Sequence, residues 1–505
     1  MNTKTRNLEL LNSDLKKTKN WFIDHLQKLE STVHIYTHLD ADGLSAGAIL
    51  GKALYREKIP FQITVLRQLE REEIIKIAEN SKDSKKFLIF ADFGSGQYLE
   101  LTEKLNNLDN NVPYIILDHH LPQNVSNKND DKIKEIYSNS RPWHINPYFY
   151  EFDGSGEISG AGMCYFFVKS LNQKNFDLSP IALVGATGDV QSRGPNNSFT
   201  GLNAVILEHA TKADLVEVSN DLNFSSIKPL NEAISYSSDI NLPGLSDNTS
   251  KMLKFLKSLG ILMETSQGDI KTLNDLNQEE KQKVSSAIIE YMSLKLNIEP
   301  SDIIEKLIVS KYVLKNEIVG SQLHDLKDFA YLLNSCGRSD NAALGIAIAM
   351  GDRKIAYNKA KDHLSNYKKS LGQALSWLKD ENKIQYKNNI QYFFGENVIF
   401  ENIVGTVASM LIFSKSGIID IKKPIFGCAK RKDEEVFKIS GRAHKDIVEK
   451  GVNLSEAIRE ALELSNLEAL GGGHPPAAGT KVPINKIDVF LENCDRVIEK
   501  QLRKN

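Results

Sequence analysis

The segment Thr37-His38-Leu39-Asp40-Ala41-Asp42-Gly43 decides the fold, because it joins a predicted strand to a predicted helix. Residues 32–37 before it are mostly β-branched and aromatic, as is typical of a strand, and residues 43–56 after it carry apolar side chains at helical spacing. A strand, a short polar turn and a helix in this order predict the first unit of a parallel α/β sheet.

The same alternation continues along the first third of the chain. Residues 61–66, 87–91 and 114–117 are short apolar runs, and residues 181–187 form a fourth. Continuous apolar runs suit strands that are buried on both faces of a parallel sheet. We therefore expect an α/β domain with a doubly wound, mainly parallel sheet over residues 1–211.

Acidic and histidine side chains follow four of the predicted strands. Besides the opening segment, they are Asp92, the triplet Asp118-His119-His120, and Asp189. A single Asp in such a place is commonly a helix N-cap. Ligands of open α/β sheets bind outside the carboxyl ends of the strands, however, so we expect all four clusters at one edge. Carboxylates gathered there need a compensating cation, and mixed Asp and His ligands favour manganese, zinc or iron over calcium. The pattern predicts a dinuclear metal site.

Composition narrows the class of protein further. The chain has 505 residues, with 63 Lys and Arg against 65 Asp and Glu, so its formal charge is −2 and no global basic field is present. Its four cysteines, Cys164, Cys336, Cys428 and Cys494, share no C-x-x-C spacing, which argues against a cysteine-based zinc site or a disulfide framework. The sequence shows no signal peptide and no membrane-spanning run, so we expect a cytoplasmic protein without a membrane partner.

The ordered clusters resemble the motifs of a known superfamily. His38-x-Asp40-x-Asp42-Gly43, Asp92, Asp118-His119-His120 and Asp189 are similar to the four motifs of DHH phosphoesterases, and Gly471-Gly472-Gly473-His474 resembles the signature of their DHHA1 domain. The likeness therefore reaches from one end of the chain to the other, in the order of the family.

Within that superfamily the chain most resembles archaeal RecJ-like nucleases. The similar stretches are His144-Ile145-Asn146-Pro147, Gly154, residues 158–162 and Leu333-Asn334-Ser335-Cys336-Gly337-Arg338. The lysine-, glutamate- and asparagine-rich residues 212–317 match no named family and show helical spacing at 252–263 and 279–296. We expect a DHH catalytic domain over residues 1–211, a helical connecting or inserted module over 212–317, and a smaller α/β domain of the DHHA1 type over 318–505.

The resemblance implies a division of labour in the metal site. Two divalent cations are expected, Mn²⁺ by preference and Mg²⁺ as the alternative. His38 and Asp40 would hold one of them; Asp42, His119 and Asp189 would hold the other. Asp92 would bridge the two cations. His120 would lie beside the scissile phosphate, with Asp118 behind it as an orienting carboxylate. Asp92, Asp118 and His120 are thus the expected catalytic residues.

The C-terminal domain is expected to bind the substrate. The glycines at 471–473 allow backbone amides to approach a phosphate, and His474 and the Ser440-Gly441-Arg442 stretch offer further anion contacts. Asn334 and Arg338 are candidate contacts as well. The alternative for the glycines is a plain C-cap of a helix that starts at Asn453 and ends at Leu470. The alternative for Asn334 and Arg338 is a helix end and a surface charge. Residues 422–445 hold eight basic side chains against three acidic ones, which suits a nucleic-acid backbone or a solvated surface.

These features predict a metal-dependent phosphodiesterase that degrades single-stranded DNA or RNA from an end, in replication, repair or RNA turnover. The resemblance implies a partner such as the GINS component of the replicative helicase. One alternative is an oligoribonuclease or cyclic-dinucleotide phosphodiesterase, although a dinucleotide needs no added middle module. The other is a non-catalytic subunit of a replication complex, although every ligand position here is filled.

Overall fold

The computed structural model describes residues 3–29, 31–82, 85–106, 112–123, 125, 130–140, 143–237, 239–413, 418–432, 434–468 and 471–503. The chain forms two compact units, Met1–Leu364 and Ser365–Asn505. No helix in these ranges is both long enough and apolar enough to cross a membrane.

The first unit is built on a parallel sheet of five strands in the order β2-β1-β3-β4-β5. The strands are β1 (Thr32–His38), β2 (Phe61–Leu66), β3 (Lys86–Ala91), β4 (Tyr114–Leu117) and β5 (His144–Ile145). Their side chains point alternately to two separate cores, one containing Ile35 and Ile89 and the other Phe90 and Ile116.

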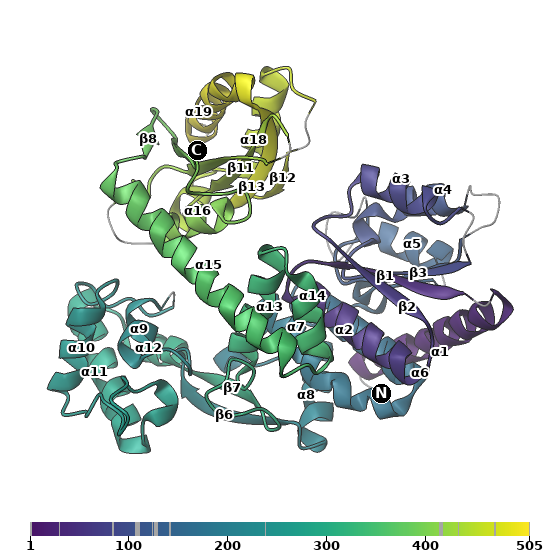
Figure 1. Cartoon of the computed structure of the whole chain (residues 1–505), viewed down its shortest axis with the longest axis horizontal. Coiled ribbons are helices and arrows are strands. Elements are labelled where there is room, and N and C mark those ends of the chain that lie inside the picture. The colour runs from purple at the N-terminus through teal and green to yellow at the C-terminus, as the bar shows by residue number, and fades with distance from the viewer. Residues whose placement is uncertain are drawn as a thin grey trace. The chain divides into compact units, whose positions relative to one another are not determined.

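Helices cover both faces of this sheet, as predicted for a doubly wound domain (Figure 1). One face is packed by α1 (Thr3–Leu29), α2 (Ala41–Arg56) and α6 (Gly160–Leu171), and the other by α3 (Arg71–Glu79) and α4 (Tyr98–Asn106). A further helix, α5 (Lys132–Ser140), precedes β5. Buried β-branched and aromatic strands flanked by amphipathic helices thus account for the α/β fold.

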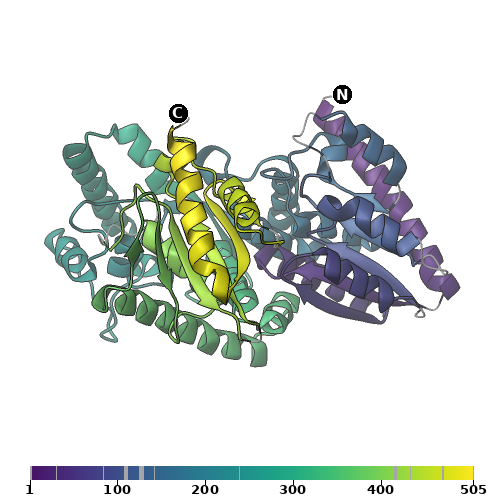
Figure 2. The same ribbon diagram turned by 90° about the horizontal axis from the view of Figure 1, so that it is seen from above.

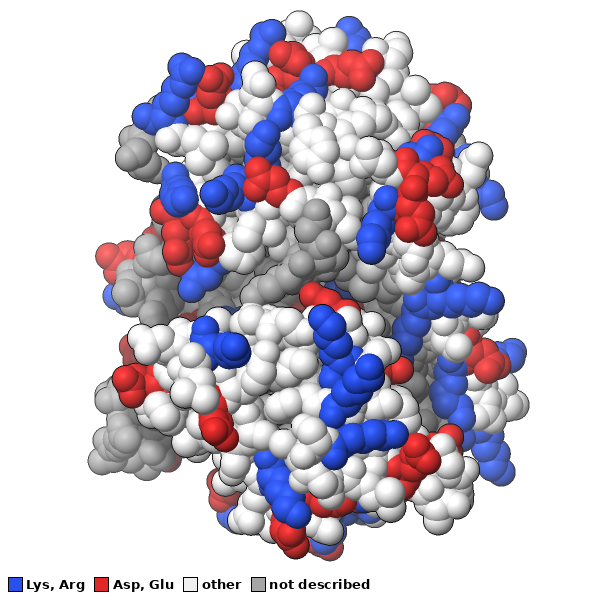
Figure 3. Space-filling model, turned by 90° about the vertical axis from the view of Figure 1, so that its left-hand side faces the viewer, with Lys and Arg blue, Asp and Glu red and all other residues white. Residues whose placement is uncertain are grey.

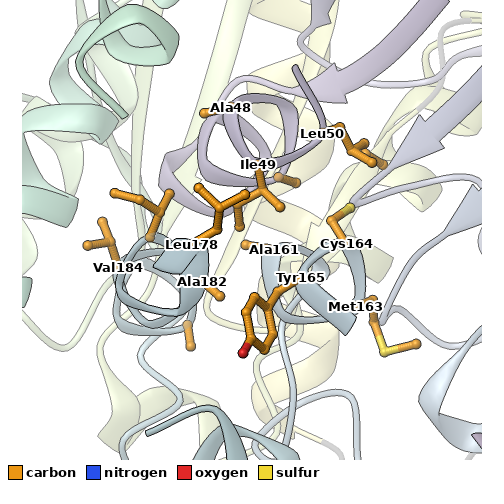
Figure 4. Packing of buried hydrophobic residues seen from close by; sticks show 14 of the residues in the cluster. Ala48, Ile49, Leu50, Ala161, Met163, Cys164, Tyr165, Leu178, Ala182 and Val184 are labelled. Atoms are coloured by element: carbon orange, nitrogen blue, oxygen red, sulfur yellow. The ribbon is translucent and has the colours of Figure 1, made fainter. Parts of the chain in front are cut away.

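The fourth predicted strand is wrong, because residues 181–187 lie in a helix, α7 (Ser179–Gly188). Every residue of α7 from Ser179 to Ala186 is buried. Side chains of α7 such as Ala182 and Val184 pack against Ile49 of α2 and Ala161 of α6 in one cluster (Figure 4). A helix that is apolar all round shows no helical periodicity, so its sequence looks like that of a buried strand.

A two-stranded antiparallel ribbon connects the middle module to the rest of the first unit. Its strands are β6 (Val216–Leu222), which follows α8 (Gly201–Lys212), and β7 (Ile308–Leu314). Between these strands lie α9 (Leu230–Ser235), α10 (Thr249–Ser258), α11 (Gln278–Leu296) and α12 (Pro300–Leu307), which share a core of their own. The module is helical as expected, but α10 ends at Ser258 rather than Met263, because Gly260 adopts a positive φ of 74°.

Residues 318–364 belong to the first unit and not to the C-terminal domain expected from the sequence. They contain α13 (Leu326–Arg338) and α14 (Ala342–Met350). Their apolar side chains, among them Leu333, Cys336 and Ile348, join the same core as α2 and α7. The boundary between the units therefore lies at Leu364, because these two helices are buried in the core of the first unit. The order of segments along the sequence does not show this packing.

The second unit is a smaller α/β domain, which confirms the predicted fold class. Its mixed sheet has the strand order β12-β13-β11-β10-β9-β8. The strands are β8 (Gln385–Tyr386), β9 (Gln391–Phe394), β10 (Ile425–Lys430), β11 (Val436–Arg442), β12 (Gly472–His474) and β13 (Ala477–Pro483). The helices α18 (Leu454–Leu464) and α19 (Ile487–Arg503) pack on one face, where α19 crosses the strands in Figure 2. The helices α15 (Ile355–Asp380) and α16 (Val404–Phe413) contribute to the core on the other.

The helix capped by Asn453 begins as predicted but ends early. The Asn453 side chain accepts hydrogen bonds from the backbone N–H groups of Ser455 and Glu456. The helix stops at Leu464, not at Leu470, and the glycines start strand β12. They are therefore not the C-cap of α18.

Candidate metal centre

The acidic and histidine clusters meet at the carboxyl edge of the first sheet. Strand β1 ends at His38, Asp92 directly follows β3, and the triplet Asp118-His119-His120 directly follows β4. Asp189 comes from the C-terminal end of α7, where it is the C-cap residue. Three strands and one helix, rather than four strands, thus bring these side chains together.

Two groups of ligand atoms face each other across Asp92. The His38 Nδ1 atom lies 2.8 Å from Asp40 Oδ2 and 3.7 Å from Asp92 Oδ2. The other carboxylate oxygen, Asp92 Oδ1, lies 3.2 Å from His119 Nε2. His119 Nε2 is also 3.3 Å from Asp189 Oδ2 and 3.7 Å from Asp42 Oδ2. Asp92 therefore stands between the His38–Asp40 pair and the Asp42–His119–Asp189 trio.

The structure contains buried polar atoms at this place that no hydrogen bond satisfies. They are both carboxylate oxygens of Asp92 and the Nε2 atom of His119. Unpaired buried carboxylate oxygens are unfavourable unless a cation binds them. Their donor set of Asp and His fits divalent transition metals. Every group of three or more possible metal ligands found in the described part of the chain belongs to this cluster.

A backbone carbonyl fixes the orientation of His119. Its Nδ1 atom lies 2.7 Å from the carbonyl oxygen of Gly154, which can only accept a hydrogen. In the neutral imidazole that could bind a metal, Nδ1 therefore carries the proton and the lone pair of Nε2 faces the carboxylates. The buried Gln191 holds the same carbonyl, because its Nε2 donates to the oxygens of Gly154 (2.9 Å) and Ile158 (3.1 Å).

Asp42 and Asp92 are held by close backbone packing. The N–H groups of Gly160 and Ala161, at the start of α6, donate to the two Asp42 carboxylate oxygens over 2.6 and 3.0 Å. A Cβ atom on Gly160 would lie 2.6 Å from Asp92 Oδ1, and one on Gly185 would lie 2.4 Å from Asp42 Oδ1. Asp92 itself has a positive φ of 64°. Backbone strain of this kind is typical of functional sites.

The crowded carboxylates shift the proton affinities of the cluster. Burial raises the pKa of Asp92 well above its ordinary value, as do the neighbouring Asp42 and Asp40. Burial and Asp42 likewise raise the pKa of Asp189 to about 7. Burial disfavours the charged form of His119, but Asp189 and Asp42 outweigh it and raise its pKa to about 9. Without a cation, the cluster therefore keeps protons that metal ions would displace.

The DHH turn presents His120 to solvent. Asp118 Oδ1 accepts hydrogen bonds from the backbone N–H groups of His119 and His120 and lies 2.8 Å from His120 Nδ1. Asp118 is fully buried, whereas 57% of the His120 side chain is exposed. Despite its burial, Asp118 has a pKa well below its ordinary value because of His120. Asp118 is thus ionised and orients the imidazole.

A buried network behind this turn was not predicted. The Ser95 N–H donates to Asp118 Oδ2 over 2.8 Å, and Ser95 Oγ lies 2.8 Å from Nε2 of the buried His144. The Asn146 side-chain amide donates to Ser95 Oγ and to the carbonyl of His120. The resemblance at residues 144–147 marked His144 and Asn146 in the sequence, but nothing marked Ser95 or Gln191.

Asn334 and Arg338, the candidate substrate contacts of α13, differ in their surroundings. The Asn334 Oδ1 atom accepts a hydrogen bond from the Ala41 N–H over 3.0 Å, so Asn334 supports the loop that carries Asp40 and Asp42. Arg338 is the exposed last residue of α13. The substrate role of Arg338 stays a prediction, whereas Asn334 contacts the loop that carries the predicted ligands Asp40 and Asp42.

In the second unit, the other substrate candidates lie on β11 and β12, the two strands that flank β13. Ser440 of β11 and Gly472 of β12 pair with the same residue of β13, Gly479. Arg442 and His474 likewise pair with Ala477. The side chain of His474 lies outside the described residues. Gly471 precedes the strand, and Gly473 has a positive φ of 136°.

The basic stretch at residues 422–445 is partly neutralised. The Arg431 guanidinium pairs with Glu401 at 2.8 Å and with Glu434 at 2.5 Å, and Lys430 lies 3.3 Å from Glu435. Basic and acidic side chains are also interspersed on the face of the molecule shown in Figure 3. Lys432 is an exposed side chain of this stretch.

The domains match three family models in order along the chain. The N-terminal domain of the DHH family matches residues 32–187, the DHH-CID domain residues 222–308 and the DHHA1 domain residues 389–500. An uncharacterised protein of Methanocaldococcus jannaschii is 32% identical over 474 residues, which are 94% of this chain and 94% of that protein. The chain belongs to the DHH/DHHA1 superfamily.

Solved structures of CDC45 and RecJ share the fold of this chain. CDC45 from Entamoeba histolytica superimposes with a TM-score of 0.65 at 12% identity and covers 97% of this chain and 99% of its own. An exonuclease RecJ bound to manganese gives a TM-score of 0.55 at 14% identity and covers 96% and 94%. RecJ from Thermus thermophilus in complex with Mn²⁺ gives 0.54 at 15% identity and covers 96% and 55%. The sequence patterns assigned the middle module to no family, and the match identifies it as a DHH-CID domain.

Proposed function

We propose that this protein is a divalent-metal-dependent phosphodiesterase that hydrolyses single-stranded DNA or RNA from an end. The observation that carries the proposal is the position of Asp92, whose two unpaired carboxylate oxygens face two separate sets of His and Asp ligands. A bridging carboxylate between two such sets is what a pair of cations needs.

The residues present fit two cations. His38, Asp40 and one oxygen of Asp92 would hold the first, and Asp42, His119, Asp189 and the other oxygen of Asp92 the second. Bound divalent cations supply an activated water and offset the charge that develops on a phosphate. RecJ proteins crystallised with manganese share this fold, which supports Mn²⁺ as the ion, and Mg²⁺ is the proposed alternative.

The chain's own contribution begins with His120. Its ring is the exposed member of the cluster, and Asp118 accepts the hydrogen on its Nδ1 atom, so an imidazolium at this place would donate from Nε2 to a phosphate oxygen. Ser95 and the backbone N–H groups keep Asp118 ionised and fixed. His120 thus acts as the substrate-facing donor and Asp118 as its positioning residue.

A polymeric substrate is supported by the second unit. Ser440 and Arg442 of β11 and the glycines of β12 lie on the two strands that flank β13, and they offer several anion contacts. The whole-chain likeness to an exonuclease RecJ supports the same substrate class. The resemblance of the motifs to those of archaeal RecJ-like nucleases supports a role in replication or repair, with a partner such as GINS. The proposed location is the cytoplasm, which suits a chain with only four scattered cysteines.

The test is digestion of 5′- and 3′-labelled DNA and RNA strands by the wild type, with EDTA and with added Mn²⁺. Asp92→Asn is expected to lose activity by orders of magnitude but to remain folded, which a thermal melting transition would show. Asp14→Asn is the matched control, since Asp14 is a buried aspartate of α1 outside the metal cluster. Near wild-type turnover by Asp92→Asn would refute the dinuclear site.

A length series separates the alternative substrates. Turnover that is already maximal with a dinucleotide or a cyclic dinucleotide would replace the polymer by a small substrate. Metal binding without hydrolysis of any of these substrates would instead favour a non-catalytic subunit.

A further inference from the structure

The end of α7 has an unusual residue directly after the metal-site residue Asp189. The Val190 N–H donates to the Thr187 carbonyl over 3.0 Å, and the Gln191 N–H donates to the Ala186 carbonyl over 2.9 Å. These two bonds form a Schellman motif, in which the residue at the position of Val190 adopts a left-handed conformation and is usually glycine. Val190 has a φ of 55°.

Folding gains little from a valine at this position. A β-branched residue is the least suited to a positive φ, because its side chain crowds the backbone. Burial of the side chain could offset this strain, yet 62% of Val190 is exposed. The strain therefore has no compensation within the fold, and strain of this kind concentrates at functional sites.

The surroundings fix Val190 beside the metal centre. Asp189, the preceding residue, lies 3.3 Å from His119 Nε2. Gln191, the following residue, is buried and bonds to the carbonyls of Gly154 and Ile158 and to the Asn203 side chain. The turn is thus held from behind, and Val190 has a fixed place next to the ligands.

An exposed arginine accompanies the valine. The Arg193 Nε atom donates to the carbonyl of Val190 over 2.8 Å, which keeps the guanidinium close to the turn. Arg193 is otherwise exposed, so its terminal N–H groups can bind a phosphate in a forked geometry.

We propose that Val190 and Arg193 form a substrate-binding pair at the metal centre. Val190 packs against the sugar or base of the nucleotide whose phosphate is cleaved, and Arg193 binds a neighbouring phosphate. The pair selects a phosphodiester that carries nucleosides over an inorganic phosphate chain, which offers no apolar surface. This inference rests on the proposed function and names how the same site recognises its substrate.

The test compares Val190→Gly with Lys58→Gly. Lys58 occupies the same position of a Schellman motif at the end of α2 and has a φ of 57°. The Lys58 N–H donates to the Tyr55 carbonyl, and the Ile59 N–H donates to the Leu54 carbonyl. Glycine relieves the strain in both variants, so both should melt at a higher temperature than the wild type. Only Val190→Gly should bind substrate less well.

Binding is measured by fluorescence anisotropy with a labelled single-stranded tetranucleotide, in the Asp92→Asn background to prevent cleavage. Val190→Gly should weaken binding by about tenfold, the effect of one lost apolar contact. Inorganic tripolyphosphate, used as a competitor, should bind both proteins equally. Arg193→Gln should reduce the salt dependence of oligonucleotide binding by about 0.7 log units per decade.

The outcomes distinguish the two proposals. If the wild type hydrolyses oligonucleotides and Val190→Gly binds them as tightly as its parent, the valine contact is wrong and the proposed function stands. An equal loss in Lys58→Gly, or an equal loss of tripolyphosphate binding, also overturns the contact. A wild type that cleaves no nucleic acid overturns the proposed function and this inference with it.

Discussion

Metal binding should expel protons from the cluster, and two side chains set a lower limit on their number. At pH 7 His119, with a pKa of about 9, carries an additional ring proton, and Asp189, with a pKa of about 7, is protonated in about half of the molecules. Burial and the neighbouring aspartates raise the pKa of Asp92 well above its ordinary value, which acts in the same direction. Because ligands bind in their deprotonated forms, saturation with Mn²⁺ at pH 7 should release at least about one proton per chain.

The stability of the metal-free protein should fall as pH rises. The pKa of His119 is raised from 6.5, so its contribution is complete below pH 6.5 and is lost as the pH passes 9. The pKa of Asp189 is raised from 3.8, so the stability that its protonated form provides is lost as the pH passes 7. The Asp189 effect operates between about pH 4 and 7 and the His119 effect between about pH 6.5 and 9, so together they destabilise the apo-protein progressively over the whole range from pH 4 to 9. Mn²⁺ binds more tightly over the same range, so the difference in melting temperature between loaded and chelated protein should widen.

Calorimetric titration with Mn²⁺ in two buffers of different ionisation enthalpy measures the released protons directly. The apparent Kd should fall about tenfold per pH unit for each proton released. His119→Gln is the internal check, because it should reduce the release by about one proton. A Kd that does not change between pH 6 and 8, with no proton release, would refute the assignment of these side chains as ligands.

Three further outcomes follow from single contacts. His144→Phe should lower kcat by about 10- to 100-fold through the loss of the Ser95 contact, with Mn²⁺ affinity retained. The control, His34→Phe, removes another buried imidazole, which lies 2.8 Å from Thr64, and should leave kcat unchanged; equal effects in both would assign His144 a purely structural role. Gly160→Ala should weaken Mn²⁺ binding by at least about tenfold because its Cβ would displace Asp92, and Gly156→Ala, which meets open space, is its control in the same calorimetric titration. Lys432→Gln should flatten the salt dependence of oligonucleotide binding by about 0.7 log units per decade, while Arg431→Gln should leave it unchanged, because Glu401 and Glu434 already neutralise Arg431.

The parts of the fold that the sequence predicts are those set by local patterns. Residues 61–66 and 114–117 form strands with the predicted ends, because short apolar runs between polar turns have few alternatives in a parallel sheet. The meeting of His38, Asp92 and His119 follows from the same rule, since parallel strands end at one edge.

The parts that the sequence does not predict depend on contacts between distant segments. Residues 181–187 form a helix because other helices surround them on every side, and periodicity carries no signal there. Asn334 reaches the backbone of Ala41 across 293 positions of the chain, a contact that no local pattern encodes. Val190 shows the same limit, because a left-handed valine is visible only in the backbone angles.

The ribbon of β6 and β7 determines how the middle module is joined to the rest of the first unit. Val216 pairs directly with Leu314, so the chain enters and leaves the module at points about 5 Å apart. A tight turn of two residues could close that gap. A chain without the module could then keep the scaffold of the parallel sheet unchanged, so the module is built as a separable insertion.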